Sequence, residues 1–371
     1  MKIIAVNAYP LHNSGGLSIL EQLIRGIEFY SQDCGYLLFV HPGVRVKTTA
    51  KNIRFVDVHQ NPFDKKLFRW NFSGMKKWLD SHGITPDAVI SMANVNSLIQ
   101  PGIPNFLYFH QAIPLYPYRW NPFLSNQRVL WMYKTVFRFF VKWSLKPDTE
   151  VFVQLECIKN RFSNTFKTDK SRIHVITPEG MSESCSSTPS PMKVDPEYCN
   201  LIYPATPFLH KNHKVLIEAL QILEKYKKFK INLYLTCTKE QVKNLCDLPL
   251  GDHGIRVTYL GYIHQEELKS LYRQVDALLF PSKIESFGLP LIEAASYGLP
   301  IAAADTDFAR EVLCHYPGAR FVPEDDPGLW AEQIAQLSHA KGERYEPLQI
   351  EQKHSWGKFF EIIHKSINKD V

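Results

Sequence analysis

Two glutamates lie eight positions apart where a loop is expected to enter a helix. The chain reads VDALLFPSKIESFGLPLIEAASYGLP around them, and they are Glu285 and Glu293. The apolar run Ala277–Phe280 predicts a buried strand, and Leu289–Tyr297 predicts a short helix with a proline just inside its start. A helix start offers unpaired backbone N–H groups and a positive dipole end, and both favour a phosphate. The segment therefore predicts an anion site between two carboxylates, although a plain connection with two surface glutamates has the same spacing.

The same stretch resembles, nearly residue for residue, the Glu-x7-Glu signature of retaining GT-B glycosyltransferases of the family-4 type. The resemblance implies that Glu285 lies beside the donor sugar and that Glu293 binds the ribose hydroxyls of the nucleotide. It also implies that the backbone amides between them hold the diphosphate, and these amides belong to Ser286, Phe287, Gly288 and Leu289. Neither a metal nor a cofactor is expected, because the nucleoside-diphosphate sugar is itself the donor substrate.

Other segments resemble the same family, more faintly in the first half of the chain. The stretch YPATPFLHKNHKVLIEAL places Lys211 where the family has a lysine on the donor phosphate. Gly15 and Gly16 match a glycine turn that approaches the diphosphate from the other domain. The stretch YFHQAIP matches the segment that brings a histidine, here His110, to the donor sugar.

One position departs from the family pattern. Six residues before the phosphate lysine the family usually has an arginine, and here that position is Ala205. A second cation on the diphosphate must therefore come from elsewhere, with Lys283 and His210 as the candidates.

Metal-ligating residue types occur in patterns that do not favour a metal site. The triplet Asp305–Asp307 has the Asp-x-Asp pattern by which another glycosyltransferase fold holds a divalent cation, but it follows the predicted strand Ile301–Ala304 and is interpreted as an acidic loop. His210 and His213 form a pair without a clear third ligand. The seven cysteines are scattered and contain no Cys-x-x-Cys pair, which predicts reduced thiols.

Short apolar runs alternate with amphipathic helices along the chain, and the Ser- and Pro-rich segment Glu179–Tyr198 reads as a linker. The predicted strands are Ile3–Ala8, Tyr36–Val40, Ile53–Val58, Ala88–Ser91, Asn105–Phe109 and Thr149–Val153, then Asn200–Tyr203, Ile231–Thr236, Val257–Leu260, Ala277–Phe280 and Ile301–Ala304. This order predicts α/β architecture with two parallel sheets covered by helices on both faces. The resemblance names the arrangement as GT-B, in which two doubly wound Rossmann-like domains face a cleft.

The expected domains are an acceptor-side domain over residues 1–180 and a nucleotide-sugar-binding domain over residues 181–353. The stretch HSWGKFF resembles the start of the family's terminal helix. It implies that residues 354–371 pack back on the first domain.

Positive charge is concentrated in the first half. Residues 1–178 carry 22 Lys and Arg against 11 Asp and Glu, and no acidic residue lies between Ala88 and Pro147. Within residues 116–147, aromatic residues alternate with cations that recur at every fourth position: Lys134, Arg138, Lys142 and Lys146. This composition is typical of a helix on an anionic membrane, and also of a buried helix whose cations point to solvent. No motif for reading nucleic acid accompanies it.

The absence of a long apolar run and of a cleavable leader predicts a cytoplasmic protein, peripheral on the inner face of the cytoplasmic membrane if it contacts lipid. The resemblance implies retaining, metal-independent transfer of a hexosyl-type unit from a nucleoside-diphosphate sugar to a glycan acceptor. That acceptor would be lipid-linked, as in bacterial surface polysaccharide or O-antigen synthesis. Two alternatives remain: a non-catalytic sugar-nucleotide-binding protein, and a UDP-sugar epimerase or hydrolase on the same fold.

Overall fold

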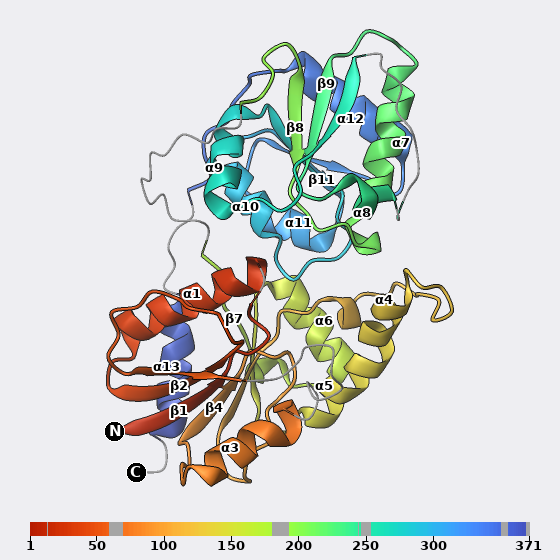
Figure 1. The fold of residues 1–371 in the computed structure, drawn as a ribbon. Helices are drawn as coiled ribbons and strands as arrows, with labels where there is room; N and C mark the ends of the chain where they lie inside the picture. Colours follow the sequence, from red (N-terminus) through yellow and green to blue (C-terminus); the bar gives the residue numbers. More distant parts are fainter. Residues whose placement is uncertain are drawn as a thin grey trace. The chain divides into compact units, whose positions relative to one another are not determined.

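The computed structural model describes residues 1–12, 14–58, 70–179, 193–243, 245, 254–349 and 355–368. The chain forms two compact units. The first comprises Met1–Pro122, Arg128–Glu179 and Gln352–Val371, and the second comprises Phe123–Gln127 and Gly180–Glu351. Figure 1 labels their helices and strands.

The first unit contains a seven-stranded sheet in the order β3-β2-β1-β4-β5-β6-β7, and all neighbouring strands are parallel. The strands are β1 (Lys2–Asn7), β2 (Cys34–Val40), β3 (Ile53–Asp57), β4 (Ala88–Ser91), β5 (Asn105–Tyr108), β6 (Glu150–Val153) and β7 (Ile173–Val175). The chain proceeds outward from β1 to β3 and then returns to the other side of β1 at β4. The carboxyl ends of β1 and β4 therefore form the point where such sheets bind ligands.

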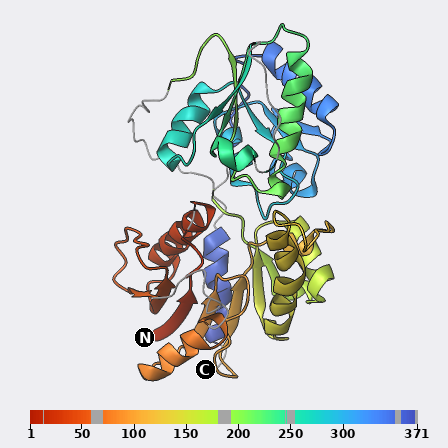
Figure 2. The ribbon, with the colours of Figure 1, turned by 45° about the vertical axis from the view of Figure 1, so that its right-hand side comes forward.

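Helices cover both faces of this sheet. One face packs on α1 (Ser14–Tyr30) and on the C-terminal helix α13 (Ser355–Ile367), which lie side by side in Figure 2. The other face packs on α3 (Met75–Ser81), which follows the π-helical turn η1 (Trp70–Gly74). Gly26 permits the contact between α1 and α13, because a Cβ there would lie 2.7 Å from Cε2 of Phe360.

The segment between β5 and β6 is irregular. It contains η2 (Ile113–Leu115), α4 (Arg128–Met132), the π-helical turn η3 (Tyr133–Phe137) and α5 (Arg138–Ser144). Lys134 points into the unit and donates hydrogen bonds to the carbonyl oxygens of Pro114, at 3.3 Å, and of Tyr116. Burial lowers its pKa to about 8. Of the four cations that the sequence spaces along one side of a helix, Lys134 is therefore held by the unit itself, whereas Arg138 and Lys142 are exposed.

Between β6 and β7 the chain forms α6 (Glu156–Phe166) and the short helix η4 (Lys170–Arg172). Thirteen residues follow that the structure does not describe, 180–192, so most of the predicted linker Glu179–Tyr198 lies outside the described residues. His354, the first residue of the predicted terminal segment, also lies outside them. The described part of that segment, α13, shares the core of the first unit with α1.

The second unit contains a six-stranded parallel sheet in the order β10-β9-β8-β11-β12-β13. The strands are β8 (Cys199–Tyr203), β9 (Ile231–Leu235), β10 (Ile255–Tyr259), β11 (Ala277–Phe280), β12 (Ile301–Ala304) and β13 (Ala319–Val322). The helices are η5 (Leu209–Lys211), α7 (His213–Glu224), α8 (Lys239–Lys243), α9 (Gln265–Gln274), α10 (Leu289–Ser296), α11 (Asp307–Val312) and α12 (Pro327–His339). Here the strand order reverses between β8 and β11.

The prediction of two doubly wound parallel sheets with helices is confirmed. Two outer strands, β7 and β13, were not predicted. Among the helices of the described residues, none combines the length and the apolar composition that crossing a bilayer requires.

Candidate active site

The helix that follows β11 begins at a glycine in the left-handed region. Gly288, the residue before α10, has φ 94° and ψ 56°, a conformation that disfavours side chains with a Cβ. Pro290 lies in the first turn, where its missing N–H costs no helical hydrogen bond. The Leu291 N–H donates to the Gly288 carbonyl at 2.9 Å, and the Leu289 N–H lies at the positive end of the helix. The loop thus has the local geometry of an anion site.

Lys211 and Glu285 form an ion pair in front of this helix. Nζ of Lys211 lies 2.5 Å from Oε1 of Glu285, and less than a fifth of either side chain is exposed. Lys211 ends η5 after β8, and Glu285 lies in the loop after β11, so the reversal of strand order brings them together from 74 positions apart. Tyr203, at the end of β8, donates a hydrogen bond to the Lys211 carbonyl at 2.7 Å and fixes that backbone.

Glu293 lies on the buried side of α10. The hydroxyl of Tyr272 donates to its Oε2 at 3.2 Å. Burial raises the pKa of Glu293 to about 7, and the Tyr272 hydrogen bond and the charge of Lys269 oppose that shift only in part. Lys269 is itself buried and pairs with Glu266 at 2.9 Å. The sequence interpretation missed Tyr272 and Lys269, although their spacing of three on the amphipathic α9 places them on one helix face.

The two candidates for the second cation differ in charge. Burial lowers the pKa of His210 to about 3, with the neighbouring charge of Lys211 adding to the effect, so its ring is neutral near pH 7. Lys283 forms an ion pair with Asp325. Its backbone N–H also donates to the His210 carbonyl at 2.9 Å, which ties the two loops together. Ala205 is buried and contributes no charge.

Asp305 and Thr306 of the Asp-x-Asp triplet make hydrogen bonds within the second unit. Both carboxylate oxygens of Asp305 accept from the Arg310 guanidinium, at 2.5 and 2.9 Å, and these hydrogen bonds lower the pKa of Asp305. Thr306 caps α11 by accepting from the Ala309 N–H at 3.3 Å. Within the described ranges, no group of three or more His, Cys, Asp and Glu side chains is arranged to hold a metal ion.

The two predicted glycines belong to the first unit. The sequence interpretation placed Gly15 and Gly16 in a turn, but α1 begins at Ser14 and includes both. A Cβ at Gly16 would lie 3.2 Å from Cα of Leu11, so close packing on the preceding segment favours glycine there. A Cβ at Gly15 would meet no atom within 4 Å. Packing within the chain therefore gives no reason for a glycine at position 15.

His110 lies two residues beyond β5 in the first unit. Asn94, which follows β4 and has φ 60°, accepts from the His110 backbone N–H at 2.6 Å through Oδ1. Its Nδ2 lies 3.2 Å from Nε2 of the ring, which assigns Nε2 as the acceptor and places the ring proton on Nδ1. Burial lowers the pKa of His110 to about 4, so the ring is neutral. Asn94 was not predicted, although asparagine tolerates the left-handed region and follows a strand at the switch point.

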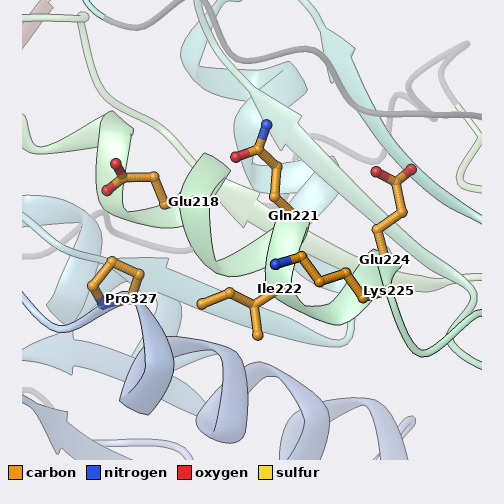
Figure 3. Close-up of a pocket in the computed structure, with 6 residues that line it drawn as sticks. All are labelled: Glu218, Gln221, Ile222, Glu224, Lys225 and Pro327. Atoms are coloured by element: carbon orange, nitrogen blue, oxygen red, sulfur yellow. The ribbon is translucent and has the colours of Figure 1, made fainter.

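A surface hollow on the second unit does not coincide with the predicted residues. Figure 3 shows it on α7 and at the start of α12, lined by Glu218, Gln221, Ile222, Glu224, Lys225 and Pro327. None of the predicted donor residues lines it. The ion pair of Lys211 and Glu285, with Glu293 on the helix behind, is therefore the better candidate within this unit.

Comparison with known proteins identifies this part of the chain. Residues 195–354, which include Lys211, Glu285 and Glu293, match the family described as "Glycosyl transferases group 1". Over these residues the second unit is similar to this glycosyltransferase family, and the matched range includes the strand–loop–helix segment from β11 to α10 together with η5.

One relative matches about half of the chain, and solved structures extend the comparison of the fold to nearly all of it. The O-antigen chain mannosyltransferase RfbU of Salmonella typhimurium is 29% identical over 209 residues, which are 55% of this chain and 55% of RfbU. Sucrose-phosphate synthase from Thermosynechococcus elongatus has a TM-score of 0.65 at 14% identity, over 99% of this chain and 95% of that one. WaaG, a glycosyltransferase involved in lipopolysaccharide biosynthesis, has a TM-score of 0.63 at 11% identity, over 96% and 93%. The predicted GT-B fold is confirmed.

Proposed function

We propose that this chain is a retaining glycosyltransferase that moves a hexosyl-type unit from a nucleoside-diphosphate sugar to a hydroxyl of a glycan acceptor. The observation that carries the proposal is the pairing of Lys211 with Glu285 in front of α10, with the buried Glu293 on the helix behind. The cation and the helix start suit the diphosphate of such a donor. The two carboxylates suit the hydroxyls of its sugar and of its ribose.

The diphosphate would take the place of Glu285 as the partner of Lys211. The negatively charged oxygens of the diphosphate would contact the Lys211 ammonium and the backbone amides of Ser286–Leu289 at the positive end of α10. Glu285, released from the ion pair, would accept hydrogen bonds from the sugar hydroxyls. Glu293 would accept from the ribose hydroxyls, and Tyr272 would hold its carboxylate in position. Lys283 would supply the second cation on the diphosphate, because Ala205 occupies the position where the family usually has an arginine.

Transfer then breaks the bond between the anomeric carbon and the phosphate oxygen and forms a bond from that carbon to the acceptor oxygen. The acceptor proton passes to the leaving phosphate, which accounts for retention without a covalent enzyme nucleophile. Lys211 and the helix start stabilise the charge that develops on the leaving diphosphate, without reorganisation and without a metal. The family resemblance also assigns the neutral ring of His110 to a sugar hydroxyl and Gly15 and Gly16 to the diphosphate.

The acceptor we propose is a lipid-linked glycan of bacterial surface polysaccharide synthesis. The name of RfbU, an O-antigen chain mannosyltransferase, supports this class and a hexosyl donor such as a mannosyl nucleotide. The basic first unit supports it as well, because a lipid-linked acceptor is presented at an anionic membrane surface. The protein would accordingly act at the cytoplasmic face of the membrane.

A thermal-shift panel of UDP, GDP, ADP and dTDP tests the donor half of the proposal. One nucleotide should stabilise the wild type, by about 2.7 kcal/mol at a hundredfold excess over its Kd. Lys211→Met should lose most of that shift. Lys214→Met is the matched control, because Lys214 lies three positions further along the chain, on α7, and is exposed. If no nucleotide shifts the wild type, or if both variants respond equally, the donor site is wrong.

Turnover of the matching nucleotide sugar separates the enzyme from its alternatives. Transfer to a glycan acceptor supports the proposal, with the anomeric configuration read by NMR of the product. Nucleotide release or epimer formation without acceptor would instead favour a hydrolase or an epimerase. Tight donor binding with no turnover under any acceptor would favour a binding protein.

A further inference from the structure

The helical segment from α4 to α5 exposes a row of large apolar side chains. Its members are Val129, Met132, Val136, Phe139 and Trp143, whose exposed fractions are 53%, 47%, 38%, 65% and 58%. They are spaced by three and four residues, so they follow one side of the helical path through α4, η3 and α5. We refer to these five residues as the apolar row.

The opposite side of the same segment is fixed to the first unit. Leu130, Val141 and Ser144 are buried. The Ser144 hydroxyl accepts from the Asn96 N–H at 3.1 Å, and its carbonyl accepts from the Asn96 side chain at 3.0 Å. Because the buried side already anchors the segment, the outward direction of the apolar row is set by the fold.

Cations accompany the apolar row. Arg128, Arg138 and Lys142 are exposed, and each directly precedes a member of the row. The surrounding sequence from Ala88 to Pro147 contains no acidic residue. Large apolar side chains beside cations of a single sign match a surface with an anionic face over an apolar interior.

We propose that the apolar row inserts into the anionic leaflet of a lipid bilayer, with Arg128, Arg138 and Lys142 on the lipid phosphates. The long stems of these cations let their charges remain at the headgroups while the row enters the acyl boundary. The inference deepens the proposed function, on which it rests for the lipid-linked acceptor. The sequence suggested membrane contact through a row of four cations. In this inference the apolar side chains insert into the lipid, and neighbouring cations contact its phosphates.

Charge argues against the other occupants of this surface. In a symmetric dimer built on the row, the like-charged residues of two copies would face each other. A nucleic acid would use the cations but leaves Val136 and Phe139 in contact with a hydrated backbone. A bilayer satisfies both kinds of side chain.

The segment is also tied to the neighbourhood of His110. The Lys134 ammonium donates to the carbonyl oxygens of Pro114, in the middle of η2, and of Tyr116, the residue after η2. This short helix follows His110 closely in the sequence. Insertion of the row would therefore hold the His110 segment at a defined height above the lipid, where a lipid-linked acceptor is presented.

Cosedimentation of the full chain with vesicles tests the inference, using phosphatidylcholine alone and phosphatidylcholine mixed with phosphatidylglycerol. The wild type should bind the anionic vesicles, and Phe139→Ser with Trp143→Ser should weaken binding at least tenfold even at low salt. The matched control changes two exposed aromatics of the second unit, Tyr226→Ser with Tyr262→Ser, and should bind as the wild type does. Arg138→Gln with Lys142→Gln should bind at low salt and lose binding as salt rises.

Quenching by brominated lipid supplies a second measurement. The tryptophan emission of the wild type should be quenched in these vesicles, and Trp143→Phe should lose most of that quenching while it still binds. Equal quenching in both proteins would place Trp143 outside the bilayer and overturn the inference.

The remaining outcomes are equally decisive. If the row variant binds anionic vesicles as the wild type does, the contact is electrostatic only. If the wild type binds no vesicles, and ultracentrifugation shows a dimer that the row variant lacks, the row is an interface between copies. The nucleotide thermal shift is measured on every variant, so loss of the donor site and loss of membrane binding are scored separately.

Discussion

Replacing Glu293 by glutamine removes a buried charge while nearly preserving shape. In the wild type the carboxyl is buried, accepts from the Tyr272 hydroxyl at 3.2 Å and has a pKa raised to about 7. An amide oxygen can still accept from Tyr272. The substitution therefore isolates the effect of ionisation from the effect of packing.

The magnitude follows from the shift in pKa. A rise from 4.5 to about 7, at about 1.4 kcal/mol per pH unit, corresponds to about 3 kcal/mol. Because the folded carboxyl holds its proton more tightly than the unfolded one, its contribution to stability is fully present below pH 4.5. That contribution is lost as the pH rises through about 7. Glu293→Gln should therefore unfold with less dependence on pH and should be more stable than the wild type at pH 8, by up to about 3 kcal/mol.

Nucleotide binding should change in the opposite direction. Ribose hydroxyls bind an ionised carboxylate better than an amide, so Glu293→Gln should weaken nucleoside-diphosphate binding by ~1.5–3 kcal/mol at pH 8. In the wild type the affinity should rise between pH 6 and 8 as Glu293 ionises. In the variant that rise should be smaller, because only the terminal phosphate of the nucleotide still ionises over this range. The difference between the two proteins should be smaller at pH 6.

Urea unfolding and calorimetry between pH 5 and 8.5 measure both effects. The control is Glu332→Gln, because Glu332 is an exposed glutamate on α12 of the same unit. A variant whose stability follows pH as the wild type's does would show that Glu293 is not the titrating group. Unchanged nucleotide affinity at pH 8 would refute its role at the ribose.

Three further predictions concern other parts of the chain. Transfer should continue in excess EDTA, since Lys211 and the helix start carry the diphosphate; loss of activity that manganese restores would return Asp305 as a ligand. Trp356→Ala should lower the stability of the first unit by ~3–5 kcal/mol in urea unfolding, because this fully buried ring stacks on Tyr108. The pH–rate profile should show no step near pH 6.5 from His110, whose pKa is about 4, and His110→Ala should lower kcat while the nucleotide Kd stays within about twofold.

The strands that the sequence predicted well are the buried ones. Ala88–Ser91, Ala277–Phe280 and Ile301–Ala304 have the predicted bounds, because each is a continuous apolar run in a sheet covered on both faces. β7 and β13 were missed. Both lie at sheet edges and are short, and each has only one fully buried position, so neither gives a strong local signal.

The candidate site also contains features that the sequence predicted and features that it did not. The resemblance identified Lys211 and Glu285 separately, but no local pattern predicts a contact across 74 positions, and the sheet topology supplies it. The inward direction of Lys134 was missed. A spacing of four places the cations along one side of a helix but does not show what that side contacts, and the carbonyl oxygens that hold Lys134 belong to Pro114 and Tyr116, about twenty positions earlier.

The position of α13 sets the order in which the chain can finish folding during synthesis. Trp356, Phe359 and Ile363 complete the core that α1 begins, and Lys2 of β1 donates to Oδ1 of Asn368 at 2.9 Å. The ribosome must make residues 180–351 between these two parts, which takes roughly 9–35 seconds at about 5–20 residues per second. Throughout that interval the apolar side of α1 has no α13 to cover it. The half of the molecule that is translated first is therefore completed last, and its uncovered helix face is the surface that a nascent-chain chaperone would bind.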